Sequence, residues 1–286
     1  MKIREFINTK VLGPYFQKPV PFRCDRSGKC CRDLVVSRKR ELEVIRENSG
    51  PFYRTLPDRG LKGVMIFDWE RKSLEKTLKE RGQKGKFEPG MVLIPKDKKL
   101  PPIVVKWLFY YSSCPFIGTD GLCGIYKERP LTCRRFPLGG IGGIFSSIRR
   151  GVPVAIPISN LCCDGEKTNL PEFFLSPKAM AEKFSAAFGE CFSAKVKSDA
   201  DDMVILGLQR FAEKNLGIPF EEGYLHPEGV WTLSKKGGVP ISEFFIERKL
   251  LTEKQLLRAI ERNRKELETL LFSGKIREIK KHKISF

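Results

Sequence analysis

Apolar residues at helical spacing predict two helices in the second half of the chain. The segment 178–188, KAMAEKFSAAF, follows the pair Ser176–Pro177, which suits an N-cap and a first helical position, and it ends before Gly189. The segment 199–215 has similar character and ends before Gly217. Both patterns favour helices that bury one face.

A third and longer helix is expected near the C-terminal end. The residues Thr252-Glu-Lys-Gln255 form a capping box, in which two side chains satisfy the first amide groups of a helix. Apolar residues that share one face follow the box: Leu256, Ile260, Leu267 and Leu271.

Shorter helices are predicted in the first half. Ser37 is a suitable N-cap for 37–48, where Leu42 and Ile45 are apolar. Asp68 is expected to cap 69–81, WERKSLEKTLKER, and Gly82 to end that helix.

Strand signals are weaker and lie between these helices. Residues 84–102 are rich in Lys, Pro and Gly and resemble an insertion, with a short strand at 91–94. Residues 139–159 predict a hairpin that turns at Arg149–Gly151, and its two prolines would confine the second strand to a sheet edge.

These elements together predict an α+β fold. We expect a loop-rich, metal-centred cysteine domain with a small antiparallel hairpin over 1–165, followed by a helical region over 166–286. A hydrophobic content of 41% and a charged content of 30% indicate a globular protein. The run IVVKWLFYY is too short to span a membrane, and MKIREFINTK has no secretory apolar core, so we expect a cytoplasmic protein.

The net charge of +19 is spread unevenly. Residues 1–150 carry 32 Lys and Arg against 15 Asp and Glu, whereas residues 151–250 carry 11 against 14. A field of this sign attracts RNA, DNA or an acidic protein partner. The alternative is a lysine-rich solvated surface, since no nucleic-acid-binding motif accompanies the charge.

Cysteine is the residue type that carries the strongest chemical signal. Eight of the nine cysteines fall in clusters, and the chain has two histidines. Soft thiolate ligands favour zinc or an iron–sulfur cluster. The candidate ligands are Cys24, Cys30, Cys31, Cys114, Cys123, Cys133, Cys162 and Cys163. The ninth, Cys191, is expected to be a small core residue.

The spacing favours iron–sulfur over zinc. Common zinc modules use CxxC turns, and this chain has none. A four-iron cluster accepts ligands from separated segments, which is how these thiols are distributed. Two or three disulfides are the alternative, although a reducing compartment disfavours them. Arg129 and Tyr126 are assigned to cofactor binding, and pairing of Arg129 with the metal site or a surface carboxylate is the competing interpretation.

The motifs resemble a known family. FRCDRSGKCC, then CPFIGTDGLCGIYKERPLTCRRFP, then CCDG are similar to the CxxCxxCC zinc- or iron-chelating proteins, also called YkgJ-type cysteine cluster proteins, which include the flagellin lysine N-methylases. The resemblance covers about residues 20–40 and 110–165. This chain has Ser27 where many members have a second cysteine.

The resemblance implies a metal centre, and its methylase branch implies methyl transfer from S-adenosylmethionine to a protein lysine. The chain carries no Rossmann-type methyltransferase fingerprint and no CxxxCxxC triad. A second hypothesis is a non-catalytic binding module in which the metal has a structural role. Such a module would dock on RNA, DNA or an acidic protein through the basic N-terminal half. A third is metal or redox delivery.

Overall fold

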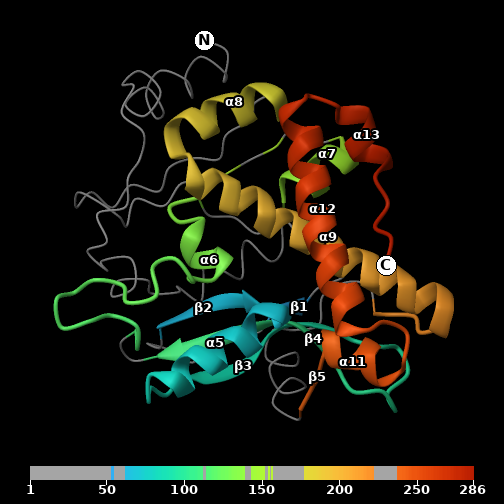
Figure 1. Ribbon diagram of the computed structural model, residues 1–286. Coiled ribbons are helices and arrows are strands. Elements are labelled where there is room, and N and C mark those ends of the chain that lie inside the picture. Colours follow the sequence, from blue (N-terminus) through green and yellow to red (C-terminus); the bar gives the residue numbers. More distant parts are fainter. Residues whose placement is uncertain are drawn as a thin grey trace. The chain divides into compact units, whose positions relative to one another are not determined.

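The computed structural model describes residues 53–54, 62–111, 114–138, 143–151, 154, 156, 177–221 and 237–286 (Figure 1). The chain divides into two compact units, each described by itself. Unit 1 includes Gly118–Met203 and Glu261–Lys283, and unit 2 includes the described residues up to Ile117, Val204–Ile260 and Ile284–Phe286. Helices and a mixed sheet confirm the α+β class. The helix predicted over 37–48 lies outside the described residues.

Unit 2 is built on a five-stranded sheet. The strands run in the order β1-β3-β4-β2, all antiparallel, and β5 pairs with β4 in parallel. Two helices pack on the sheet, α5 and α11. The elements are β1 (Tyr53–Arg54), β2 (Lys62–Phe67), α5 (Asp68–Glu80), β3 (Lys86–Leu93), β4 (Ile103–Tyr111), β5 (Val239–Pro240) and α11 (Ile241–Glu247).

The strand β4 lies at the centre of this sheet because its sequence, IVVKWLFYY, is apolar on both faces. Val104 and Val105 are fully buried, and the Lys106 amine lies 4.4 Å from the centroid of the Phe67 ring. Its neighbour β3 includes residues 91–93 of the strand predicted at 91–94 and begins earlier, at Lys86. A bulge in β3 requires Gly90, where an added Cβ would lie 2.3 Å from the Met65 sulfur.

The helix α5 confirms the predicted helix and its end, since Gly82 has a φ of +63°. The predicted cap was wrong by one position. Phe67 is the N-cap residue, and its amide donates a hydrogen bond to Glu70 Oε2 at 3.1 Å. Asp68 is the first residue of the helix. The Asp68 carboxylate is directed into the interior of unit 2.

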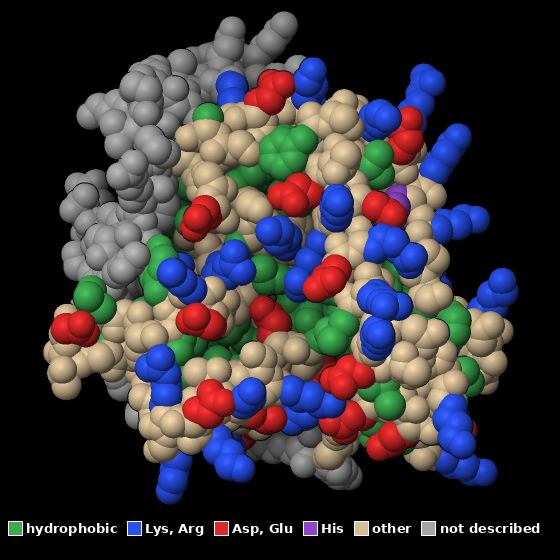
Figure 2. All heavy atoms as spheres, viewed as in Figure 1, with side chains coloured by type: hydrophobic (Ala, Val, Ile, Leu, Met, Phe, Trp, Pro, Cys, Tyr) green, Lys and Arg blue, Asp and Glu red, His purple; other side chains and the backbone are tan. Residues whose placement is uncertain are grey.

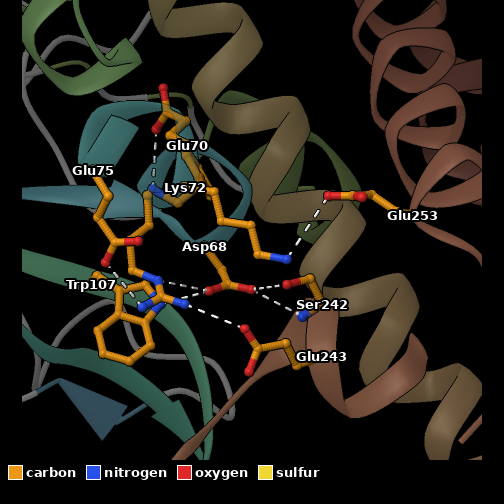
Figure 3. A network of polar contacts seen from close by, with 10 residues as sticks. Asp68, Glu70, Lys72, Glu75, Trp107, Ser242, Glu243 and Glu253 are labelled. Carbon is orange, nitrogen blue, oxygen red and sulfur yellow. Dashed lines mark hydrogen bonds and ion pairs between the residues drawn. The ribbon is translucent and has the colours of Figure 1, made fainter. Parts of the chain in front are cut away.

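Asp68 is the centre of a buried polar network (Figure 3). One carboxylate oxygen accepts a hydrogen bond from Trp107 Nε1 at 2.6 Å. The other accepts from the amide and hydroxyl of Ser242, at 3.0 and 2.5 Å. The carboxylate therefore joins the first turn of α5, the middle of β4 and the first turn of α11, which lie far apart in the sequence.

Arg71 covers this network from the solvent side. Its guanidinium carbon lies 4.4 Å from the Trp107 ring centroid, and its terminal nitrogens reach Glu75 at 3.2 Å and Glu243 at 3.5 Å. Cation–π and carboxylate contacts of this kind hold the side chain over the buried aspartate.

Unit 1 is mainly helical in its described part. It contains α6 (Leu131–Arg134), α7 (Ile144–Arg150), α8 (Pro177–Phe188) and α13 (Ile276–Lys281), together with parts of α9 (Glu190–Leu216) and α12 (Glu253–Phe272). Its core contains a row of phenylalanine rings, with Phe184 5.6 Å from Phe188 and 5.7 Å from Phe192, centroid to centroid. Contacts of this geometry add to the free energy that apolar burial supplies.

The long helices confirm the periodic patterns. The helix α8 ends at Phe188 as predicted, and Gly189 has a φ of +45°. The helix α9 ends at Leu216, close to the predicted end, but begins at Glu190 instead of at 199. At the start of α12 the Thr252 amide bonds Gln255 Oε1 at 2.8 Å, which confirms the capping box. The four residues of its predicted apolar face are buried.

The hairpin predicted over 139–159 was wrong where the structure describes it. Residues 144–150 form α7, and Gly151 ends that helix with a φ of +70°. Ile144, Phe145 and Ile148 are buried, at a spacing that fits one face of a helix. The segment is too short for periodicity alone to separate a strand from a helix, so contacts elsewhere in unit 1 decide between them.

None of the helices in the described part of the chain has the length and the apolar composition that crossing a bilayer requires.

Replacement of Asp68 tests the network of unit 2. We expect Asp68→Ala to destabilise the protein by about 3 kcal/mol or more, because the Trp107 and Ser242 donors lose their buried acceptor. The control Ser242→Ala removes one hydroxyl donor and should cost about 1 kcal/mol. Urea denaturation followed by circular dichroism measures both, and equal effects of the two changes would contradict the central role of Asp68.

Candidate functional site: the cysteine segment and the buried charges of α9

The structure describes three of the eight predicted metal ligands. Cys123 and Cys133 lie in unit 1 and Cys114 lies in unit 2, each half-buried. Cys24, Cys30, Cys31, Cys162 and Cys163 lie outside the described residues. Within the described ranges, no three His, Cys, Asp or Glu side chains are grouped in a way that could hold a metal ion. The predicted ligand set as a whole therefore stays a prediction.

A tight turn precedes Cys123. The Gly118 amide bonds the Leu122 carbonyl at 2.8 Å, and the Leu122 amide bonds Asp120 Oδ1 at 2.9 Å. Gly121 has a φ of +77°, a conformation that residues with a Cβ rarely adopt. Cys123 lies directly after this turn.

Tyr126 and Arg129 contact each other in the next turn. The Arg129 guanidinium carbon lies 3.7 Å from the Tyr126 ring centroid, and Arg129 Nε donates to the Tyr126 carbonyl at 2.9 Å. The two residues assigned to cofactor binding are therefore a stacked pair in the segment between Cys123 and Cys133. Such stacking fixes the plane of a guanidinium group.

Cys133 lies in the short helix α6. Pro130 is its N-cap residue, and the Cys133 amide bonds the Pro130 carbonyl at 2.9 Å. In this helix Leu131 is buried, Cys133 is half-buried and Arg134 is exposed.

The residue after α6 contacts the long helix α9. Arg135 Nη1 donates to Ser198 Oγ at 3.4 Å. One turn before Ser198, Lys195 is 1% exposed, and its amine lies 2.6 and 2.7 Å from the two carboxylate oxygens of Asp199. We call residues 123–135 the cysteine segment. Through Arg135 this segment contacts α9 beside the buried ion pair of Lys195 and Asp199.

Asp199 has a second role at the start of α7. Its Oδ2 accepts a hydrogen bond from the Ile144 amide at 2.8 Å. An added Cβ at Gly143 would lie 3.1 Å from the Asp199 side chain, so the backbone approaches the carboxylate closely. A carboxylate at a helix N-terminus satisfies an unpaired amide and interacts favourably with the helix dipole. This contact satisfies the first amide of α7 and so favours a helix at 144–150 over the predicted strand.

The amine of Lys195 is electrostatically perturbed. Desolvation by burial lowers the pKa of Lys195, and the Arg135 guanidinium lowers it further, whereas the Asp199 carboxylate acts in the opposite direction. Charges taken out of water in this way require close partners.

A second set of polar contacts joins α9 to α12 within unit 1. Arg264 forms a two-pronged ion pair with Asp201, with distances of 2.7 and 2.5 Å. Asn263 Nδ2 donates to the Ala200 carbonyl at 2.7 Å, and its Oδ1 lies 2.8 Å from His282 Nε2. Because the amide oxygen of Asn263 accepts, the neutral His282 ring carries its proton on Nε2.

Sequence reasoning missed Lys195 and Asp199. The available signal was a Lys and an Asp four residues apart, a spacing that places both on one helix face. The apolar neighbours Val196 and Ala200 were a further sequence sign of burial, and both are fully buried in the structure. Cys191, predicted to be a core residue, is half-buried in the first turn of α9.

Comparisons with family models, with curated proteins and with solved structures found no match for this chain.

Removal of the buried cation tests the ion pair. We expect Lys195→Met to lower the free energy of unfolding by about 3–5 kcal/mol, because the Asp199 charge stays buried without its cation. The double variant Lys195→Met/Asp199→Asn should recover part of this loss, since a neutral amide oxygen still accepts from the Ile144 amide. Urea denaturation measures both variants, and a double variant as unstable as the single one would contradict this account.

The pH dependence of stability tests His282. Desolvation lowers the pKa of His282 below its ordinary value of 6.5, with Arg149 and Arg262 acting in the same direction and Glu266 against it. As the pH falls through 6.5 the unfolded chain therefore takes up the proton first, and the folded state loses stability. We expect the urea midpoint of the native protein to fall more between about pH 7.5 and pH 5 than that of His282→Gln. Parallel pH profiles of the two proteins would argue against it.

Proposed function

We propose that this chain binds an iron–sulfur cluster through cysteine thiolates, with Cys123 and Cys133 among the ligands. The observation that carries the proposal is the local structure of these two residues. Cys123 follows directly from a hydrogen-bonded turn, Cys133 lies in the first turn of α6, and both residues are half-buried. A thiol held in this way has a defined direction and is still accessible to a metal, unlike a thiol sealed in an apolar core.

The charges near α6 support the same proposal. A cluster with four thiolate ligands is anionic, and backbone amides and nearby cations tune its reduction potential. Arg135 follows Cys133 by two residues and contacts α9 at Ser198. The remaining ligands are proposed from the sequence: Cys24, Cys30, Cys31, Cys114, Cys162 and Cys163.

The resemblance to flagellin lysine N-methylases adds a catalytic extension. In it, S-adenosylmethionine would donate a methyl group to a protein lysine, and Arg129 and Tyr126 would contact the cofactor. This extension, like docking of the basic N-terminal half on nucleic acid or an acidic protein, stays a prediction from the sequence.

Metal analysis tests the proposal. After anaerobic purification and reconstitution, we expect a brown protein with about four iron and four sulfide per chain. Cys123→Ser and Cys133→Ser should each lower the iron and sulfide content and the visible absorbance. Cys191→Ser is the matched control, because Cys191 is also half-buried but lies outside the motifs.

The contrary outcomes are equally specific. Stoichiometric zinc without sulfide would replace iron–sulfur with a structural zinc site. Iron and sulfide contents that are the same in Cys123→Ser, Cys133→Ser and Cys191→Ser would remove both residues from the ligand set.

A further inference from the structure

The ends of two helices in unit 1 meet and bring several cations together. Arg149, in the last turn of α7, donates a hydrogen bond to the His282 carbonyl just after α13. An added Cβ at Gly151 would lie 3.8 Å from the Lys280 amine. The helices α7 and α13 therefore pack side by side, and their C-terminal ends share one surface.

We define the basic helix-end surface by six residues: Arg149, Arg150, Arg277, Lys280, Lys281 and Lys283. All except the half-buried Arg149 are exposed. On α13, Ile279 is fully buried, so Arg277 and Lys281, one turn apart, project from the opposite face. Figure 2 shows Lys and Arg side chains projecting along the upper right of the view, where α13 lies in Figure 1.

Little acidic charge offsets these cations. Glu278 is the one carboxylate in the segment 275–283, and Glu266 of α12 lies 3.8 Å from His282 Nδ1. Among the described residues, no carboxylate forms an ion pair with Arg150, Arg277, Lys280, Lys281 or Lys283. Attraction to the helix C-termini explains part of the charge at Arg150, Lys280 and Lys281. It does not explain Arg277, which lies in the first turn of α13, or Lys283, which lies beyond the helix.

The chemistry of the surface discriminates between anionic partners. A membrane-binding helix presents large apolar side chains beside its cations. The exposed large apolar residues of the described chain are Leu122, Leu257 and Phe272, and none belongs to α7 or α13. Residues 275–285 also contain no Phe, Tyr or Trp on which unpaired bases could stack. Cations without apolar or aromatic neighbours suit the phosphates of a double helix.

We propose that the basic helix-end surface binds the phosphate backbone of a nucleic-acid duplex without reading its base sequence. Four of its six residues lie at 277–283, outside the basic N-terminal half to which the sequence assigned nucleic-acid contacts. The overall charge of +19 adds long-range attraction to the same partner. The proposal does not depend on the metal centre.

Charge-neutralising variants of the full chain test the proposal. The first is the triple variant Lys280→Gln/Lys281→Gln/Lys283→Gln. Its matched control is Lys214→Gln/Lys249→Gln/Lys254→Gln, which removes the same charge from three exposed lysines of unit 2 that lie outside residues 1–150. The probe is a fluorescein-labelled DNA duplex of about 20 base pairs, with binding measured by anisotropy over a salt series. Thermal unfolding followed by circular dichroism confirms that both variants fold.

The expected result is selective loss in the first variant. At about 100 mM salt its affinity should fall at least ~10-fold, and the slope of log affinity against log salt should flatten by about 2.7, since each of the three lost phosphate contacts contributes about 0.9. The control should lose far less affinity and keep its slope.

Three outcomes would overturn the proposal. Equal losses in the two variants would show that net charge alone, and not this surface, attracts DNA. Absence of duplex binding by the unaltered protein would remove the partner. Binding to phosphatidylserine–phosphatidylcholine vesicles that the first variant abolishes, without duplex binding, would identify a membrane surface in its place.

Discussion

A buried aspartate that accepts a hydrogen bond from a helix N-terminal amide organises each unit of this protein. In unit 2 Asp68 accepts from Ser242 at the start of α11, and in unit 1 Asp199 accepts from Ile144 at the start of α7. A carboxylate taken out of water is strongly unfavourable unless every lone pair finds a donor or a cation. Each aspartate therefore requires its partners to be in place, and this requirement ties together segments that are remote in the sequence.

The same constraint bears on the candidate site. Asp199 forms an ion pair with Lys195. The neighbouring Ser198 accepts a hydrogen bond from Arg135, at the end of the cysteine segment. The backbone that carries Cys133 is thus connected to α9, and α9 in turn determines where α7 begins. A metal centre that uses Cys133 would depend on a framework of buried charges as well as on its thiolate ligands.

The positive charge of the chain has two distinct physical roles. Lys195 and Arg264 are neutralised by aspartates at hydrogen-bonding distance, so they contribute to folding and little to the external field. Five of the six cations of the basic helix-end surface are exposed to solvent. Charges of the second kind are the ones that a polyanion can reach, because a surface cation keeps its field outside the molecule. The composition alone does not separate these two groups.

The sequence by itself determined the long helices and the helix-ending glycines. Apolar periodicity and local caps act over a few residues, so 177–188, 253–272 and the end of α5 at Gly82 could be read directly. The tertiary structure decided those features that depend on contacts between residues far apart in the sequence. In the helix at 144–150 the first amide donates to Asp199, 55 positions away, a stabilising partner that no local signal reveals. Asp68, predicted as a local helix cap, is instead a buried acceptor for Trp107 and Ser242. These donors are distant in the sequence and become its neighbours only once the chain has folded.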